Sequence, residues 1–458
     1  MTGRLTVAGD VLVDRDVVGG VRRVAPDAPV PVVDVASRTT RPGGAGLAAL
    51  LAAADGRPVT LVTALGSDAA GAEVAALLED AGVDVVDLGL AGPTPEKVRA
   101  GTPGHPMLRL DYGGPPSPVG PLTPAARRAL GGAAAVLVAD YGRGVAAHPE
   151  VRAALAALPA RRPVVWDPHP RGPAPVAGAR LATPNREEAG VPPGAGLAAV
   201  TARARALAEQ WSAVGVAVTL GSRGAVLVEG DGPPLAVPAR PAAGDPCGAG
   251  DRFASRAAGL LADGALPSEA VTGAVAAAAA FVASGGAGGA LPSDPPAPRA
   301  GGDGGVVDAL ALVDGVRAAG GTVVAAGGCF DLLHAGHVGL LEAARRLGDC
   351  LVVCLNSDDS VRRLKGPGRP VQSAADRARV VLALGCVDAV AVFDEDTPEA
   401  VLARLRPHVF AKGGDYAGGR LPEAALLAGW GGQAAVLPYL EGRSTTRLIE
   451  EANAHARG

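Results

Sequence analysis

Two histidines that stand three residues apart, His334 and His337, are the residues whose types and spacing point most directly to chemistry. An apolar run at 323–326 predicts a buried strand before them, and an apolar periodicity over 338–347 predicts a helix after them. Side chains at positions i and i+3 share one face of a helix, and the unpaired N–H groups at a helix N-terminus attract anions. We therefore expect the two imidazoles to contact the charged oxygens of a nucleoside triphosphate.

Taken alone, this histidine pair has simpler explanations, because two such residues can face solvent or cap a helix. A zinc site would need further histidine or cysteine ligands at suitable spacing, and the sequence has none. A basic run that includes Lys365 and Arg369 follows the pair and favours anion binding. Residues 444–446, Ser-Thr-Thr, open the last expected helix and offer hydroxyl and N–H groups to an anion, although an ordinary N-cap is the alternative.

A second candidate site lies in the first half of the chain, where Gly248-Ala249-Gly250-Asp251 precedes an alanine-rich helix. Small residues let the backbone approach a phosphate, and the following helix adds the positive end of its dipole. Asp251 lies where a carboxylate can accept the proton of an attacking hydroxyl, the alternative being a glycine-rich loop with a capping aspartate. Asn185 and Glu188 follow an expected strand and suit a Mg²⁺–water shell or a phosphate, while a helix N-cap is the alternative for Asn185.

The elements that position these residues alternate between strand and helix, which predicts βαβ units and a mainly parallel sheet. Ligands bind outside the carboxyl ends of the strands in such sheets, and Asp140, Asp167 and Asn185 follow expected strands directly. Residues 17–40 alternate between apolar and polar, and Pro31 suits an edge strand, so we expect a small sheet that projects as a lid. The expected strands are 5–9, 60–64, 83–88, 135–139, 164–166, 180–183, 216–220 and 350–355, with helices at 71–81 and 306–319.

The length of 458 residues predicts two or three domains, and a Pro- and Gly-rich stretch without apolar periodicity marks their boundary. We expect a first domain at 1–290, a linker at 291–305 and a second domain at 306–458. The net charge of −4, without a basic block, argues against nucleic acid as a partner.

The remaining composition points to a protein of the cytoplasm. The five cysteines have no zinc-like pairing, and Cys350 and Cys354 are expected to be reduced core residues of a strand. The N-terminus lacks a signal-peptide core, and the apolar run at 274–282 is far shorter than the ~20 residues of a membrane span. A soluble cytoplasmic protein is therefore expected.

The motifs of residues 1–290 resemble those of the ribokinase-like (PfkB) sugar kinases, and within them the heptose 7-phosphate kinase branch. Residues 320–458 closely resemble the HxGH nucleotidyltransferases, in particular the adenylyltransferase half of the bifunctional heptose enzymes. The resemblance implies an α/β fold class: an N-terminal ribokinase-like α/β sandwich with a small β lid and a C-terminal Rossmann-like domain. It rests on the motifs Pro42-Gly43-Gly44-Ala45, Asp140-Tyr141-Gly142-Arg143-Gly144, Thr183-Pro184-Asn185, Gly248-Ala249-Gly250-Asp251, Gly328-Cys329-Phe330-Asp331, His334-Ala335-Gly336-His337, Leu364-Lys365-Gly366 and Lys412-Gly413-Gly414-Asp415-Tyr416.

For the kinase half, the resemblance implies roles residue by residue. Asp251 is the catalytic base, and Gly248, Ala249 and Gly250 form the anion hole. Lys97, Arg99 and Arg109 are candidate contacts for the sugar phosphate, with a solvated surface charge as the alternative for each. The other implied roles are contacts to ATP phosphates by Asn185, Arg186, Glu187, Glu188 and Gly221, an indirect contact of Glu188 to Mg²⁺, and contacts to sugar hydroxyls by Asp14, Gly43 and Gly44.

The chain departs from the kinase pattern near the sugar. Leu47 stands where the family usually has an asparagine that hydrogen-bonds the sugar, and a leucine side chain cannot do so. Arg143 and His169 stand where lysine is commoner, and Arg252 replaces a small polar residue after the base. These departures leave Asp251 in place and put the sugar substrate in question.

For the transferase half, His334 and His337 are implied to stabilise charge on the α-phosphate and on the leaving pyrophosphate. Lys365 and the residues Ser444, Thr445 and Thr446 would bind the β- and γ-phosphates. Nucleotide or sugar placement would fall to Phe330, Asp331, Arg377 and Asp415.

The resulting functional expectation is a bifunctional enzyme that uses ATP as co-substrate and Mg²⁺ as cofactor. It would phosphorylate D-glycero-β-D-manno-heptose 7-phosphate at C1 and later transfer AMP to the heptose 1-phosphate, giving ADP-heptose and pyrophosphate. The expected partners are these small molecules and a second copy of the chain, bound through the lid. The alternatives are a kinase half that is inactive or takes another sugar and, less favoured, a non-catalytic nucleotide- or sugar-binding regulator.

Overall fold

The computed structural model describes residues 3–288, 309–414 and 421–438 of the chain. Contacts divide the chain into two units. The first comprises Met1–Gly190, Ala206–Gly221 and Arg240–Asp294, and the second comprises Val191–Arg205, Ser222–Ala239 and Pro295–Gly458. The expected linker at 291–305 lies outside the described residues, so its boundaries stay a prediction.

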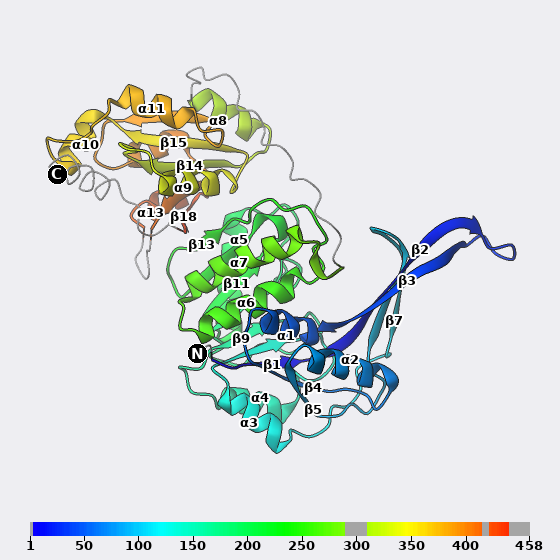
Figure 1. The fold of residues 1–458 in the computed structure, drawn as a ribbon. Coiled ribbons are helices and arrows are strands. Elements are labelled where there is room, and N and C mark those ends of the chain that lie inside the picture. The colour runs from blue at the N-terminus through cyan, green and yellow to red at the C-terminus, as the bar shows by residue number, and fades with distance from the viewer. Residues whose placement is uncertain (1–2, 289–308, 415–420, 439–458) are drawn as a thin grey trace, which may run out of the picture. The chain divides into compact units, whose positions relative to one another are not determined.

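The first unit is built on a parallel sheet in the order β5-β4-β1-β8-β9-β10-β11 (Figure 1). Helices α1 and α6 pack on one face of this sheet, and α3 and α4 on the other. Because both faces are covered, the strands are runs of Val, Ala and Leu rather than alternating patterns. The bounds are β1 Leu5–Gly9, β4 Val59–Thr63, β5 Val83–Asp87, β8 Ala135–Ala139, β9 Val164–Asp167, β10 Leu181–Ala182, β11 Gly215–Thr219, α1 Ala45–Ala54, α2 Ala69–Asp80, α3 Pro124–Gly132, α4 Pro149–Ala156, α6 Ala249–Ala262 and α7 Pro267–Ala283. Helix α5 (Leu197–Trp211) has residues in both units.

Local sequence explains where several of these helices begin. The Asp68 carboxylate accepts a hydrogen bond from the Gly71 N–H at the start of α2. Thr123 caps α3 in the same way through Ala126, and Pro124 supplies the fixed φ that suits a first helical position. These caps therefore fix where α2 and α3 begin.

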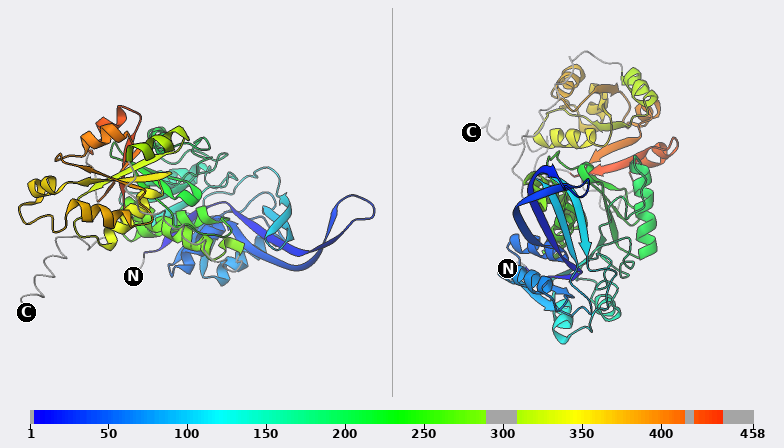
Figure 2. Two further views of the ribbon diagram at one scale, coloured as in Figure 1. Left: turned by 90° about the horizontal axis from the view of Figure 1, so that it is seen from above. Right: turned by 90° about the vertical axis from the view of Figure 1, so that its right-hand side faces the viewer.

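A separate four-stranded sheet forms the lid, in the order β3-β2-β6-β7. Strands β2 (Val11–Val24) and β3 (Pro31–Gly44) make a long hairpin that projects from the rest of the unit (Figure 2). Strands β6 (Glu96–Thr102) and β7 (His105–Tyr112) complete the sheet. The expected lid is confirmed, and β3, which begins at Pro31, lies at the edge as predicted.

The second unit has a parallel sheet in the order β16-β15-β14-β17-β18. The strand order reverses beside β14, and ligands bind at such a switch point in open α/β sheets. Cys350 and Cys354 are buried in β15, as expected. The bounds are β14 Val323–Gly328, β15 Cys350–Asn356, β16 Ala389–Phe393, β17 Val409–Gly413, β18 Gln433–Leu437, α8 Ala309–Ala318, α9 Ala335–Arg345, α10 Asp358–Lys365, α11 Ala374–Leu382, α12 Glu399–Leu405 and α13 Ala424–Ala428, with β12 Ala225–Glu229 and β13 Leu235–Val237 as an antiparallel pair of the same unit.

Among the described residues, no helix has the length and apolar character needed to cross a bilayer. The apolar run at 274–282 belongs to α7, one of the helices of the first unit.

Candidate active sites in the two units

The expected catalytic base, Asp251, lies in the first turn of α6 and is only 7% exposed. The helix is capped by Gly248, whose φ of 83° is in the left-handed region that glycine tolerates. Oδ1 of Asp251 accepts a hydrogen bond of 2.7 Å from the Tyr141 hydroxyl. Burial raises the pKa of Asp251 to about 7, against the opposing effect of the Tyr141 hydrogen bond. A carboxylate with such a pKa can take up a proton near neutral pH.

The expected anion hole, Gly248, Ala249 and Gly250, opens α6 with backbone N–H groups at a helix N-terminus. The space beside it is filled by Leu47, because a Cβ on Gly248 would lie 2.7 Å from the Leu47 Cδ2 atom. Arg252 fixes the same helix from its outer side, with two hydrogen bonds of 2.9 Å to Asp55 at the end of α1. Helices α1 and α6 are thus held together around the loop.

The expected ATP-phosphate residues lie at the carboxyl end of β10. The Asn185 N–H donates to Glu188 Oε2 at 2.8 Å, and the Glu188 N–H donates to Asn185 Oδ1 at 3.0 Å. Arg186 and Glu187 belong to the same turn. Asn185 also bridges to β11 at Thr219, and Gly221 follows that strand, so the sheet brings this set together.

The turn of Asn185 to Glu188 suits a Mg²⁺ ion that it contacts through water rather than directly. Within the described parts of the chain, no group of three or more His, Cys, Asp or Glu side chains could hold a metal ion by itself. Burial raises the pKa of Glu188, and one of its oxygens already accepts a backbone hydrogen bond. The donor set therefore suits an ion whose other ligands are water and phosphate oxygens.

The lid register explains how the sugar-binding candidates gather on one face. Asp14 on β2 is paired with Arg41 on β3 and with Lys97 on β6, and Lys97 is paired with Asp111 on β7. The next row on the same face pairs Thr39, Asp16, Arg99 and Arg109 in the same strand order. The face therefore carries alternating charges with an excess of cations.

Asp14 is buried at the inner end of this face and accepts a 2.8 Å hydrogen bond from Arg99, whose other terminal nitrogen lies 3.8 Å from Cys247 Sγ. Gly43 and Gly44 lie beside it. A Cβ on Gly43 would stand 2.6 Å from Asp14 Oδ2, and Gly44 has a φ of 62°. The three residues expected to hold sugar hydroxyls are therefore neighbours.

A cavity of about 280 Å³ opens between this face and the sheet edge. Its floor includes Tyr141, and the Lys97 ammonium lies 5.7 Å above the Tyr141 ring. Burial lowers the pKa of Lys97. The other charged or titratable groups of the lining are Glu96, Arg109, Asp111, Tyr112, Arg143, His169 and Arg171.

Sequence reasoning missed two features of this cavity. Arg171 was not singled out, and the contact of Tyr141 with Asp251 was not foreseen. A signal was present for both, because Tyr141 comes two residues after the end of β8 and Arg171 four residues after the end of β9, at the sheet edge where ligands are expected.

In the second unit, His334 is the N-cap residue of α9 and His337 lies in its first turn. Their rings stack with centroids 3.8 Å apart, and the Phe330 ring lies 5.1 Å from that of His337. Burial, followed by the effects of His334 and Lys365, lowers the pKa of His337 to about 4. His337 is therefore a neutral imidazole at physiological pH.

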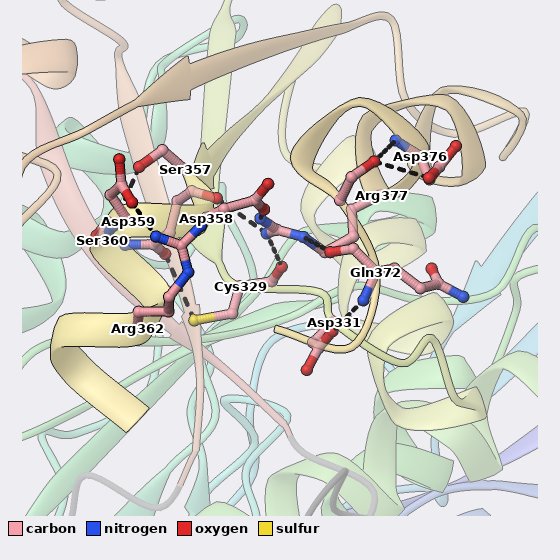
Figure 3. Close-up of polar contacts among 12 residues, drawn as sticks. Cys329, Asp331, Ser357, Asp358, Asp359, Ser360, Arg362, Gln372, Asp376 and Arg377 are labelled. Carbon is pink, nitrogen blue, oxygen red and sulfur yellow. Dashed lines mark hydrogen bonds and ion pairs between the residues drawn. The ribbon is translucent and has the colours of Figure 1, made fainter. Parts of the chain in front are cut away.

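Two of the other transferase candidates, Asp331 and Arg377, contact loop residues of this unit (Figure 3). Asp331 accepts hydrogen bonds from Arg369 Nε at 2.5 Å and from the N–H of Val371 at 2.7 Å. Burial would raise the pKa of Asp331, but these bonds hold it below the usual value. Phe330 is buried with a φ of 44°, and Arg377 is 0% exposed, with protein groups as its observed partners. Direct nucleotide contact by these residues stays a prediction.

Two lysines complete the described part of this site. Lys365 ends α10 and is exposed, and its charge acts on His337. Lys412 near the end of β17 makes an ion pair of 2.8 Å with the buried Glu423. The candidates Asp415, Ser444, Thr445 and Thr446 lie outside the described residues.

The geometry of both sites agrees with the comparison to known proteins. The pfkB family carbohydrate kinase model matches residues 4–294, and the cytidylyltransferase-like model matches residues 325–450. The bifunctional protein HldE of Streptomyces coelicolor is 58% identical over 99% of this chain and 97% of its own length. The bifunctional protein HldE of Pseudomonas entomophila is 38% identical over 98% and 97%. The chain belongs to this bifunctional HldE family.

Membership confirms the resemblance seen in the sequence, the α/β fold class with a ribokinase-like first half, and the function as a sugar kinase joined to a nucleotidyltransferase. Among solved structures, a phosphofructokinase-2 variant from Escherichia coli matches 62% of this chain and 94% of its own, with a TM-score of 0.50 and 19% identity. That likeness shows the fold of the kinase half.

Proposed function

We propose that the kinase half transfers the γ-phosphate of ATP to the C1 hydroxyl of D-glycero-β-D-manno-heptose 7-phosphate. After removal of the 7-phosphate by a phosphatase, the transferase half couples the heptose 1-phosphate to AMP from ATP. The products are ADP-heptose and pyrophosphate. The enzyme classes follow from the family, whereas the sugar, the nucleotide and the residue roles are the proposal.

The observation that carries the sugar assignment is the charge of the cavity beside Asp251. The cationic side chains Lys97, Arg109, Arg143 and Arg171 all line it, against two carboxylates, Glu96 and Asp111. A neutral sugar has no use for so many cationic groups, whereas a sugar phosphate places a dianion among them. The cavity volume of about 280 Å³ suits a sugar of this size rather than a polymer.

The proposed chemistry of the kinase half is an in-line displacement. The proton of the C1 hydroxyl passes to Asp251, the new bond forms between that oxygen and the γ-phosphorus, and the bond to the β-phosphate oxygen breaks to release ADP. Gly248 and Gly250 would offer N–H groups to the transferred phosphoryl oxygens, whereas the Ala249 N–H donates to the Pro246 carbonyl oxygen at 3.0 Å. Asp14 would orient the sugar hydroxyls from the lid side.

ATP would lie along the carboxyl ends of β10 and β11, with its phosphates beside Asn185 and Glu188. The indirect fit described above supports Mg²⁺ there, held by Glu188 through water and by phosphate oxygens. When bound, the ion would neutralise charge on the β- and γ-phosphates.

The transferase half needs no protein nucleophile. The phosphate oxygen of heptose 1-phosphate attacks the α-phosphorus of ATP, and the bond to the β-phosphate oxygen breaks to release pyrophosphate. His334 and His337 would donate hydrogen bonds to the α-phosphate and the leaving group, and Lys365 would add a positive charge. Catalysis then consists of positioning and electrostatic stabilisation.

Three further assignments remain part of the proposal. The domain boundaries at 290 and 305 and a cytoplasmic location rest on the sequence. A homodimer through the lid is supported by apolar side chains exposed on its strands, including Val35 at 47%, Leu108 at 54% and Leu110 at 39%. A monomer in light scattering at micromolar concentration would contradict the dimer.

The decisive experiment incubates the full chain with ATP or CTP and a panel of sugar phosphates and identifies the products by mass spectrometry. We expect heptose 1,7-bisphosphate from heptose 7-phosphate, and ADP-heptose from heptose 1-phosphate. Formation of ADP-heptose without the bisphosphate would instead support a kinase half that is inactive or takes another sugar, the alternative suggested by Leu47. Nucleotide binding without turnover in either half would support a regulator.

A further inference from the structure

The contact between Tyr141 and Asp251 joins two segments of the first unit that are 110 residues apart in sequence. Tyr141 follows β8, and Asp251 begins α6, so the hydrogen bond of 2.7 Å links the sheet edge to the helix that carries the base. A phenol hydroxyl has one proton to donate, and a carboxylate has two oxygens to accept. Tyr141 therefore binds Oδ1, and we expect Oδ2 to receive the acceptor hydroxyl.

We propose that Tyr141 is a positioning residue of the kinase reaction, which holds one oxygen of Asp251 so that the other faces the sugar hydroxyl. This inference rests on the proposed role of Asp251 as base. In this proposal, Tyr141 orients the Asp251 carboxylate and lowers its pKa, and so does more than line the cavity.

Tyr141 is itself held in place from several sides. Its backbone N–H donates to Asp10 Oδ2 at 3.1 Å. A Cβ on Gly44 would lie 3.4 Å from its ring, so the ring packs on that loop. The Lys97 ammonium lies 5.7 Å from the centroid of the Tyr141 ring, and the His169 ring stacks on the Tyr141 ring with centroids 6.4 Å apart. A ring fixed in this way can impose a direction on the carboxylate that it binds.

The electrostatic surroundings of Asp251 make this hydrogen bond consequential. Burial raises the pKa of Asp251, and the negative charge of Asp14 on β2 raises it further. The Tyr141 hydroxyl and the Lys97 ammonium on β6 act in the opposite direction. Asp167 at the end of β9 is a further carboxyl group coupled to Asp251. Of the groups that lower the pKa of Asp251, the Tyr141 hydrogen bond has the largest effect.

The hydroxyl remains a donor at every pH at which the enzyme works. Burial, together with the charge of Asp251, raises the pKa of Tyr141 well above its usual value of 10.0. The hydrogen bond therefore stabilises the charged form of Asp251 throughout the neutral range. Since the base acts only when deprotonated, loss of this bond moves the acid limb of kinase activity to higher pH.

The test is Tyr141→Phe in the full chain, which keeps the ring and removes only the hydroxyl. We expect the acid limb of kcat/KM for the kinase reaction to move upward by about 1 pH unit, since a hydrogen bond to a charged group has roughly that effect on a pKa. Activity should then fall about tenfold at pH 6.5 and much less at pH 8.5.

Two control variants separate the possible outcomes. Tyr112→Phe also removes a hydroxyl from the cavity wall, but Tyr112 does not act on the pKa of Asp251. The midpoint of the acid limb of kcat/KM in this variant should therefore match that of the wild type. Asp251→Asn should abolish kinase turnover, and AMP transfer by the other half reports the amount of active transferase half in every sample. If the acid limb of kcat/KM does not shift in Tyr141→Phe, the inference about Tyr141 is wrong, while the proposed role of Asp251 as base is not affected. Retained kinase turnover in Asp251→Asn would overturn the proposed base itself.

Discussion

Replacement of Arg377 by methionine is the change from which we expect the sharpest structural effect. Its side chain is 0% exposed and lies between four segments of the second unit (Figure 3). Its guanidinium donates to the carbonyl oxygens of Gln372 at 3.0 Å, Cys329 at 2.6 Å and Asn356 at 2.9 Å, and to Asp358 Oδ1 at 2.7 Å. The arginine thus ties the loop before the histidine pair to the ends of β15 and α10.

The size of the effect follows from these contacts. Arg377→Met keeps much of the side-chain length but removes every donor. The buried carbonyl oxygens of Cys329 and Asn356 would then lack this partner, and each such loss costs about 1–3 kcal/mol. Breaking a buried charge pair costs about 3–5 kcal/mol, but the Asp358 side chain is 32% exposed, so water offsets part of that loss. We expect the second unit to lose about 3–5 kcal/mol in total.

The assay is hydrogen exchange of the full chain followed by mass spectrometry, because it reports the opening free energy of each segment separately. Peptides from 323–345 and 350–365 should exchange faster in Arg377→Met, while peptides from 135–167 in the first unit should not change. Arg379→Met is the matched control, since Arg379 lies on the same helix and is exposed. It should stay within about 0.5 kcal/mol of the wild type.

A different result would refute this reasoning. If Arg377→Met exchanged like the wild type but raised the KM for ATP at unchanged kcat, Arg377 would be a direct nucleotide contact, as the family resemblance first implied. The positioning role instead predicts that transferase kcat falls together with segment stability, because the loop that carries His334 is displaced. Arg377→Lys should be intermediate, since an ammonium group keeps the charge but not the fork of donors.

Three further predictions follow from the two sites. The His337 imidazole, assigned by its loss in His337→Gln, should show no titration by NMR between pH 8 and pH 5, because its pKa is lowered to about 4; a midpoint near 6.5 would contradict a buried neutral ring. Asp251→Asn should raise the melting temperature more at pH 8 than at pH 5, because a carboxyl group with a raised folded-state pKa loses stability progressively as pH rises from its unfolded value of 3.8 to about 7; an equal change at both pH values would exclude this linkage. Leu47→Asn should lower the KM for the sugar phosphate several-fold, since a neutral hydrogen bond contributes about 1 kcal/mol; an unchanged KM would show that no sugar hydroxyl faces position 47.

The architecture could be predicted from the sequence because its signals are local. The apolar run expected as a strand at 60–64 is observed at Val59–Thr63, and the strand expected at 135–139 has the same bounds in the structure. Such runs depend on neighbouring residues and on burial of both sheet faces. Pro31 indicated an edge strand for an equally local reason, its missing N–H.

The charged contacts of the sites could not be predicted, because they depend on register and on packing between distant segments. A shift of one residue between β2 and β6 would turn Asp14 away from Lys97, and no local pattern fixes that register. The sequence predicts Arg377 to be a charged residue at the start of a helix. In the structure it is buried, with partners from three other segments. Its implied role as a nucleotide contact stays a prediction, and nothing in the sequence indicates these protein partners.

The two sites handle protons in opposite ways, and their chemistry explains why. Phosphorylation of a hydroxyl requires a group that accepts its proton, so burial at Asp251 is useful because it raises the pKa to about 7. Attack by a phosphate oxygen releases no proton, so the transferase half needs donors whose charge state is constant. Burial at His337, which lowers the pKa to about 4, would supply such a donor under the proposed mechanism. The same physical cause, loss of water around an ionisable group, would then produce a base in one half and a hydrogen-bond donor of constant charge in the other. Mild acidification should consequently slow the kinase reaction before it affects AMP transfer.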